Sequence, residues 1–179
     1  LMEMLAMASI VAVVVGIGGS SANNFFSGQR VASEVFGFVQ DVRAGRYGAM
    51  GTQSYHRILF KADSTGTIVE SYVVQAFEDT SSITVAADIS TARNTMYTAS
   101  WTTVLDVETR DIDPEVTFEK PSTLSYIFLR PDGLLVDQPN ENGAPIGDLI
   151  ATFTYGESVM NVNINANGIA GTSEFYEEY

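Results

Sequence analysis

The chain opens with a run of apolar residues that a single charge interrupts. The segment LMEMLAMASIVAVVVGI, from Leu1 to Ile17, contains Glu3 as its one ionisable side chain. As a helix it would extend over about 25 Å, close to the thickness of the hydrocarbon core of a bilayer. The pattern therefore predicts an N-terminal helix that is a candidate, slightly short, for spanning a membrane.

A second helical pattern follows in residues 23–47. Val31, Val35, Phe38 and Val42 recur at spacings of four, three and four, which is the repeat of one apolar helix face. The charged residues of this segment mostly fall elsewhere: Arg30, Glu34, Asp41 and Arg43. We expect a stem whose apolar face packs on a β-sheet, and a glycine cluster that ends it: Gly45, Gly48 and Gly51.

Short strand-like runs separated by turn residues take over after the stem. They are residues 55–60, 68–77, 83–89, 96–107, 124–129, 149–155 and 159–164. This order predicts an α+β fold in which one long helix packs on an antiparallel sheet. At 179 residues the chain is long enough for one globular head. We expect an anchor helix in residues 1–24, an amphipathic stem in 25–51 and a β-rich head in 52–179.

Charge and cysteine content exclude several classes of function. Nine basic residues face twenty-two acidic ones, for a formal net charge of -13. A direct nucleic-acid partner is therefore not expected, because phosphate binding needs a basic surface. The chain has no cysteine, which excludes disulfides, thiol catalysis and thiolate metal sites.

Glu3 is the most informative residue of the apolar segment. A carboxylate inside an apolar helix costs about 3 kcal/mol on insertion scales and usually persists where a positive charge lies at the same depth. A signal peptide would begin with a basic region, yet the first basic residue is Arg30. We infer that any such region has already been removed.

These residues carry a family resemblance. The start LMEMLAMASIVAVVVGI resembles mature type IV pilins and pseudopilins, in which Phe-Thr-Leu-Ile-Glu-Leu or a close variant follows the prepilin-peptidase cut. Leu1, Met2, Glu3 and Met4 then occupy the Leu-Ile-Glu-Leu positions. The resemblance implies that two residues precede Leu1 in the mature protein, including the one that the peptidase exposes and methylates.

The resemblance also implies roles for the first nineteen residues. Glu3 would pair with the N-terminal amine of a neighbouring subunit and set the axial register of a filament, and its neighbours would share the assembly helix: Leu1, Met2, Met4 and Leu5. The resemblance further implies that the segment with Gly16, Gly18 and Gly19 loses helical structure within the filament. Each glycine costs about 1 kcal/mol of helix stability. The simpler interpretation of Glu3 is an acid that a membrane anchor tolerates. The simpler interpretation of the three glycines is the ordinary end of a membrane helix.

A weaker resemblance points to one branch of that family, the GspH/FimT-type minor pilins and pseudopilins. The stretch VRAGRYGAMGTQSYHRILF is similar to the turn by which their stem enters the first strand. The stretch ESVMNVNINANGIAG is similar to their final strand, Asn-Gly turn and last short strand.

Candidate chemical sites are few. The loop PDGLLVDQPNENGAPIGD holds oxygen ligands of the kind that Ca²⁺ prefers, although their spacing does not fit an EF-hand and favours a solvated acidic loop: Asp132, Asp137, Asn140, Glu141, Asn142 and Asp148. His56 is the only histidine and is expected at the edge of the first strand. Acid pairs such as Asp111 with Asp113 are far more often surface residues than catalytic ones.

The tail EFYEEY mixes aromatic and acidic side chains in residues 174–179. It suits either a last strand against the head or an exposed contact with another subunit.

Together these observations predict a non-enzymatic structural subunit of a type IV pilus or pilus-like filament, without a cofactor. Its expected partners are identical or homologous pilins, the inner membrane before assembly, the prepilin peptidase and the pilus assembly machinery. It would finally lie in an extracellular pilus or a periplasmic pseudopilus. The alternative is a monomeric, membrane-anchored binding domain or adhesin, which leaves Glu3 without a role.

Overall fold

The computed structural model describes the backbone of residues 2–77, 101–103, 109–121, 126–136 and 145–173. Within these ranges, side chains are described for residues 25–77, 109–121, 126–136 and 145–172. One long helix packs on antiparallel strands, which confirms the predicted α+β fold.

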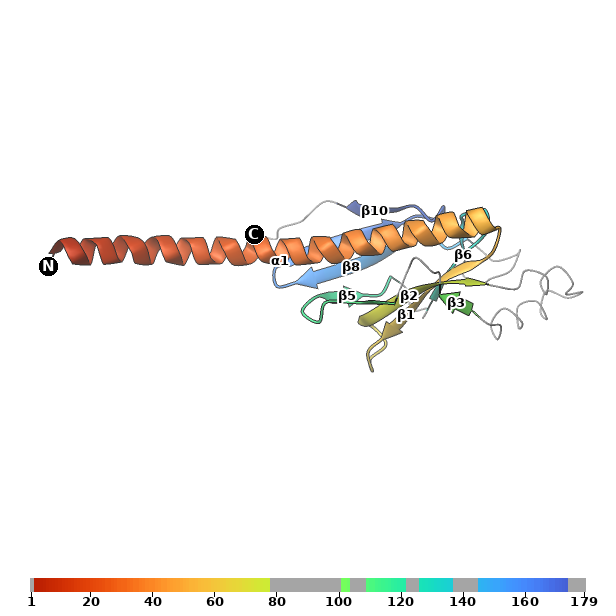
Figure 1. The fold of residues 1–179 in the computed structure, drawn as a ribbon, viewed down its shortest axis with the longest axis horizontal. Helices are drawn as coiled ribbons and strands as arrows, with labels where there is room; N and C mark the ends of the chain where they lie inside the picture. Colours follow the sequence, from red (N-terminus) through yellow and green to blue (C-terminus); the bar gives the residue numbers. More distant parts are fainter. Residues whose placement is uncertain (1, 78–100, 104–108, 122–125, 137–144, 174–179) are drawn as a thin grey trace, which may run out of the picture.

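The helix α1 runs without interruption from Met2 to Thr52. Its first half projects away from the rest of the molecule, and its second half lies along the head (Figure 1). The helix ends where the Thr52 hydroxyl donates to the Gly48 carbonyl oxygen (2.8 Å) and Gln53 adopts a φ of 53°. The predicted anchor and stem are therefore one continuous helix in this structure.

The strands within the described ranges divide into two sheets, whereas the sequence pattern suggested a single one. The first has six strands in the order β3-β2-β1-β6-β7, with β4 beside β2. Its strands are β1 (His56–Ala62), β2 (Val69–Phe77), β3 (Trp101–Thr103), β4 (Arg110–Asp111), β6 (Tyr126–Leu129) and β7 (Leu135–Val136). The second has the order β10-β9-β8-β5 and contains β5 (Thr117–Glu119), β8 (Leu149–Tyr155), β9 (Ser158–Ile164) and β10 (Ala170–Ser173).

The predicted apolar face of the stem forms the centre of the core. Its four members are all 0% exposed: Val31, Val35, Phe38 and Val42. Phe38 meets side chains of both sheets, with ring centroids 5.3 Å from Tyr72 and 5.1 Å from Phe118. The Phe118 ring stacks on Phe153 at 4.2 Å. This aromatic cluster joins the helix to both sheets because burying such rings is strongly favourable.

The prediction that the glycine cluster ends the helix is wrong for its first two members. Gly45 and Gly48 lie inside α1, on the side that faces the first sheet. A Cβ at Gly45 would lie 3.0 Å from both Leu129 Cδ1 and Val74 Cγ1, and one at Gly48 would lie 2.8 Å from His56 Nε2. These glycines therefore allow the helix to approach the sheet closely, and only Gly51 lies near the helix end.

Most of the predicted strands are present. β1, β2, β6, β8 and β9 coincide with predicted runs to within a few residues, and β3 occupies part of residues 96–107. The predicted strand at 83–89 lies outside the described residues. β4, β5 and β7 were not predicted, because two or three residues are too few to show a strand period. β10 follows an Asn-Gly turn, as the family resemblance implied.

No helix in the described part of the chain is both long and apolar enough to cross a membrane.

Candidate assembly surface

The residues to which the sequence assigned assembly lie on the projecting half of α1. Met2, Glu3, Met4 and Leu5 belong to its first turn and Leu1 precedes it, but their side chains lie outside those described. The backbone at Gly16, Gly18 and Gly19 is helical. The pairing of Glu3 and the melting at these glycines concern a filament and stay predictions.

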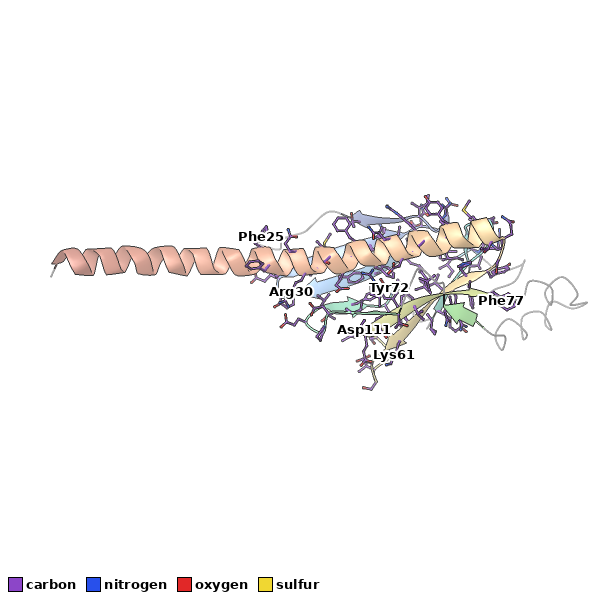
Figure 2. The ribbon with its side chains drawn as sticks, viewed as in Figure 1. Phe25, Arg30, Lys61, Tyr72, Phe77 and Asp111 are labelled. Atoms are coloured by element: carbon purple, nitrogen blue, oxygen red, sulfur yellow. The ribbon has the colours of Figure 1, made fainter. Side chains whose placement is uncertain are left out.

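The outward face of the second half of α1 carries an aromatic stripe, which we define as Phe25, Phe36 and Tyr47. Their side chains are 62%, 58% and 64% exposed. Each follows the previous one by eleven residues, about three helical turns, so the three lie on nearly one line along the helix. Figure 2 labels Phe25 at the point where α1 leaves the head. Three exposed aromatic rings on one side of the helix make this face a candidate interaction surface.

The exposed positions of α1 between Phe25 and Thr52 include no acidic residue. They are Phe25, Phe26, Gln29, Arg30, Ser33, Phe36, Gln40, Arg43, Ala44, Tyr47, Met50, Gly51 and Thr52. The two acids of this half, Glu34 and Asp41, are partly or fully buried. In a chain with a net charge of -13, the exposed positions of this half of α1 therefore stand out because none of them is acidic.

The orientation of this face is held by a buried network between α1 and the first sheet. Asp41 is 9% exposed. Its carboxylate accepts a hydrogen bond of 2.8 Å from the Tyr72 hydroxyl and forms an ion pair with Arg110, whose Nε lies 3.0 Å away. Burial, followed by the Asp41 carboxylate, raises the pKa of Tyr72 far above its usual value. The phenol therefore remains a neutral donor, as this contact requires.

Glu34 lies about two helical turns before Asp41, beside the same arginine. Its Oε2 is buried without a hydrogen-bond partner among the described residues. Burial raises the pKa of the Glu34 carboxyl, while a backbone hydrogen bond at Asp113 and the charge of Arg110 lower it. The network therefore holds one strongly bound carboxylate, Asp41, and one poorly satisfied carboxylate, Glu34.

Further contacts attach α1 to the head near Phe25. The Ser27 and Ser158 hydroxyls are 3.0 Å apart. The Arg30 guanidinium forms an ion pair with Glu115 and lies 5.5 Å from the centre of the Tyr155 ring. Figure 2 shows Arg30 on the side of the helix that faces the strands.

At the other end of the head, two arginines bind backbone carbonyl oxygens next to β10. Arg43 Nη2 donates to Ala170 (3.1 Å) and Arg46 Nε donates to Asn167 (2.8 Å). Together with the contacts of Ser27 and Arg30, these bonds fix the helix at both ends of the head. The aromatic stripe is thus presented in a defined direction.

The calcium candidate is only partly described. Asp132 forms an ion pair with Arg130 and accepts a hydrogen bond of 3.1 Å from the Leu134 amide. The Arg130 guanidinium, followed by this amide, lowers the pKa of Asp132. Asp137, Asn140 and Asn142 lie outside the described residues. Within the described ranges, no three acidic or imidazole side chains come together to hold a metal ion.

His56 begins β1, as predicted, and it is 2% exposed. Its Nδ1 lies 3.3 Å from the Ser54 carbonyl oxygen, and the ring packs against Gly48. Burial lowers the pKa of this imidazole despite the hydrogen bond at Ser54. A neutral histidine with these neighbours fills space in the core.

An open cavity of about 610 Å³ lies beyond the end of α1. Its lining residues are Met50, Gln53, Tyr55, Arg130, Pro131 and Asp132. Its two charged groups pair with each other, so this cavity does not present a converging set of ligands.

Sequence reasoning missed the network of Asp41, Tyr72 and Arg110. The available signal was Asp41 itself, an acid that directly precedes Val42 on the apolar face of the stem. Its partners come from β2 and from the two-residue strand β4, and neither could be placed beside the helix without the tertiary fold.

Comparisons with known proteins bear on the fold alone. The sequence matches no known protein-family model and no curated protein. Among solved structures, the chain is similar to the type IV minor pilin FimU of Pseudomonas aeruginosa, with a TM-score of 0.51 and 12% identity over 85% of this chain and 92% of FimU. A second crystal form of FimU gives a TM-score of 0.49 and 13% identity over 82% of this chain. The chain therefore has a type IV pilin-like fold.

Proposed function

We propose that this protein is a structural subunit of a type IV pilus or a related pilus-like filament and that it polymerises through α1. The proposal rests mainly on the length of α1 and on the surfaces that it leaves exposed. Its apolar first half extends beyond the head, and its second half turns exposed aromatic side chains outward. Both surfaces need covering, and association with other helices would remove them from water. The fold likeness to a minor pilin supports this function.

In this proposal the subunit first resides in the inner membrane, held by Leu1–Ile17. The prepilin peptidase and the pilus assembly machinery act on it there, and it then enters an extracellular pilus or a periplasmic pseudopilus. Its partners in the filament are identical or homologous pilins. Most of the association free energy comes from burial of apolar helix surface, at about 25 cal/mol per Å². No catalytic step is part of this function.

Glu3 sets the axial register by pairing with the N-terminal amine of a neighbouring subunit. An unpaired carboxylate in an apolar filament core is costly, so the paired register is favoured over the others. The experiment compares Glu3→Ala with Glu157→Ala, a change in the exposed turn between β8 and β9. Both variants should fold and reach the membrane, and only Glu3→Ala should lose filament incorporation. Normal incorporation of the Glu3→Ala variant into filaments would contradict the proposed role of Glu3.

Electron cryo-microscopy of sheared filaments tests the function as a whole. A filament that contains this chain, with α1 in its core, supports the proposal. Filaments without the chain, and protein retained in the membrane fraction, would instead favour a minor subunit at the filament tip or the monomeric anchored adhesin or binding domain.

A further inference from the structure

Glu34 lies in the seam between α1 and the turn that follows β4. Its Oε2 atom is the one buried side-chain oxygen or nitrogen of the described residues that has no hydrogen-bond partner. The carboxyl contacts the turn through a backbone hydrogen bond with Asp113. A buried oxygen that carries charge without a partner is costly, and protonation of the carboxyl removes that charge. The seam therefore favours the neutral form of Glu34.

Arg110 stands between Glu34 and a second carboxylate, Asp41. Its guanidinium crosses α1 at Gly37, where an added Cβ would overlap Nη1. Gly37 follows Glu34 by three residues and precedes Asp41 by four, about one helical turn in each direction. The Nε atom lies 3.0 Å from Asp41 Oδ2, so the ion pair of Arg110 is with Asp41. One cation is thus placed between two acids and is bound to one of them.

The other polar groups around Glu34 already have partners of their own. Arg30, one helical turn before Glu34, forms an ion pair with Glu115. The Tyr72 hydroxyl of β2 interacts with the Glu34 charge but donates its hydrogen bond to Asp41. Ionised Glu34 therefore adds a carboxylate to a cluster whose guanidiniums are already paired, and like charges disfavour its ionisation. The described charged and titratable groups of this cluster are Arg30, Arg110, Asp41, Asp113, Glu115 and Tyr72.

We propose that Glu34 is a proton-uptake site that controls how Arg110 pairs with Asp41. When Glu34 is neutral, the guanidinium pairs with Asp41 alone. When Glu34 is ionised, the guanidinium is shared between the two carboxylates across Gly37, and the ion pair with Asp41 weakens. This ion pair attaches β4 to α1, so the pH of the surroundings sets how firmly the first sheet holds the helix. The proposal does not depend on filament assembly.

The direction of the pH effect follows from burial. Burial raises the pKa of Glu34 above its ordinary value of 4.5, although the backbone hydrogen bond at Asp113 and the charge of Arg110 lower it. The folded chain therefore binds the proton more readily than the unfolded chain. The stability gained in this way is complete below pH 4.5 and is lost as the pH rises through the raised folded-state pKa. His56 changes stability in the opposite direction, so a substitution at position 34 is needed to separate the two effects.

The first test compares wild type with Glu34→Gln, which keeps the size of the side chain and removes its charge. Denaturant unfolding of the full chain in mild detergent would be measured from about pH 7.5 to about pH 5. The unfolding midpoint of the variant relative to wild type should be highest at pH about 7.5 and should fall as the pH is lowered, because only wild type gains stability from the proton. The matched control is Glu157→Gln in the exposed turn between β8 and β9, whose difference from wild type should stay constant. A constant difference for Glu34→Gln would overturn the proposal.

The second test observes Arg110 directly by nuclear magnetic resonance of the full chain in micelles. The Nε–H signal of Arg110 is identified by its loss in Arg110→Lys, since lysine lacks this group. Over the same pH range this signal should shift in wild type and stay in place in Glu34→Gln. A role of Glu34 in packing alone would not move it. A signal that shifts equally in both chains, or in neither, would overturn the control of Arg110 by Glu34.

Discussion

Tyr72 donates a hydrogen bond of 2.8 Å to the Oδ2 atom of Asp41, which joins the centre of β2 to the buried side of α1. The same oxygen is 3.0 Å from Arg110 Nε. A single helical carboxylate therefore binds two residues of the first sheet. Because this network lies opposite the aromatic stripe, it determines which face of the helix remains available to partners.

Replacement of Tyr72 by phenylalanine should weaken the attachment of the helix. The ring stays, but Asp41 loses a donor in a site where it is 9% exposed. A hydrogen bond to a charged group contributes about 1.5–3 kcal/mol, and the free energy of unfolding should fall by that amount. Chemical unfolding of the full chain in mild detergent measures it. Tyr47→Phe, on the exposed face, is the control and should leave stability unchanged.

Gly37→Ala should stabilise the protein less than Gly51→Ala, although both changes place alanine in the helix. An added Cβ at Gly37 would lie 2.7 Å from Arg110 Cζ, so the guanidinium must shift and its ion pair with Asp41 is disturbed. The weakened ion pair offsets much of the gain of about 1 kcal/mol from helix propensity. Gly51→Ala meets no atom within 4 Å and should be neutral or stabilising. Equal effects of the two changes in thermal unfolding would contradict this role of Gly37.

The two phenylalanines of the helix centre should behave in opposite ways. Phe38 is 0% exposed, and Phe38→Ala should cost about 3–5 kcal/mol of stability through the cavity that it leaves. Phe36 is 58% exposed, and Phe36→Ala should change the stability by less than about 0.5 kcal/mol. Denaturant unfolding of both variants measures the difference. A large loss for Phe36→Ala would show that the stripe packs against the head.

Stability should decrease on mild acidification because of His56. Burial holds its folded-state pKa below the ordinary value of 6.5, so the unfolded chain binds the proton more readily. The stability that the protein gains by keeping His56 neutral is complete above pH 6.5. It is lost as the pH falls from 6.5 toward the lowered folded-state pKa. Unfolding of the wild type and of His56→Gln should be compared between about pH 7.5 and pH 5.5. The variant should show a smaller decrease, and parallel curves would exclude His56 as the cause.

Gly168 and Gly156 should differ in their tolerance of a side chain. Both have positive φ, of 69° and 59°, which costs an alanine about 1–2 kcal/mol. A Cβ at Gly168 would also lie 2.7 Å from the Gly133 carbonyl oxygen, whereas one at Gly156 meets nothing within 4 Å. Gly168→Ala should therefore lower the melting temperature more than Gly156→Ala. Gly156→Asn should be nearly neutral, since asparagine tolerates this conformation.

The sequence by itself determined the long helix, its buried face and most of the longer strands. Val31, Val35, Phe38 and Val42 repeat with the helical period, and such a pattern depends only on residues close together in the chain. The apolar start with Glu3 was equally readable, and it carried the resemblance to pilins that the fold likeness supports. The proposed partner of Glu3 belongs to another subunit, so its role stays a prediction.

Only the tertiary structure decided how these elements meet. The division into two sheets, the short strand that delivers Arg110 to Asp41, and the close approach at Gly45 and Gly48 all join segments far apart in the chain. Such contacts leave no local period, because they depend on which strands pair and on the space left between helix and sheet. The aromatic stripe also needed the tertiary structure: the helical period assigns Phe38 to the buried face, but only the packed head shows that Phe36 stays 58% exposed.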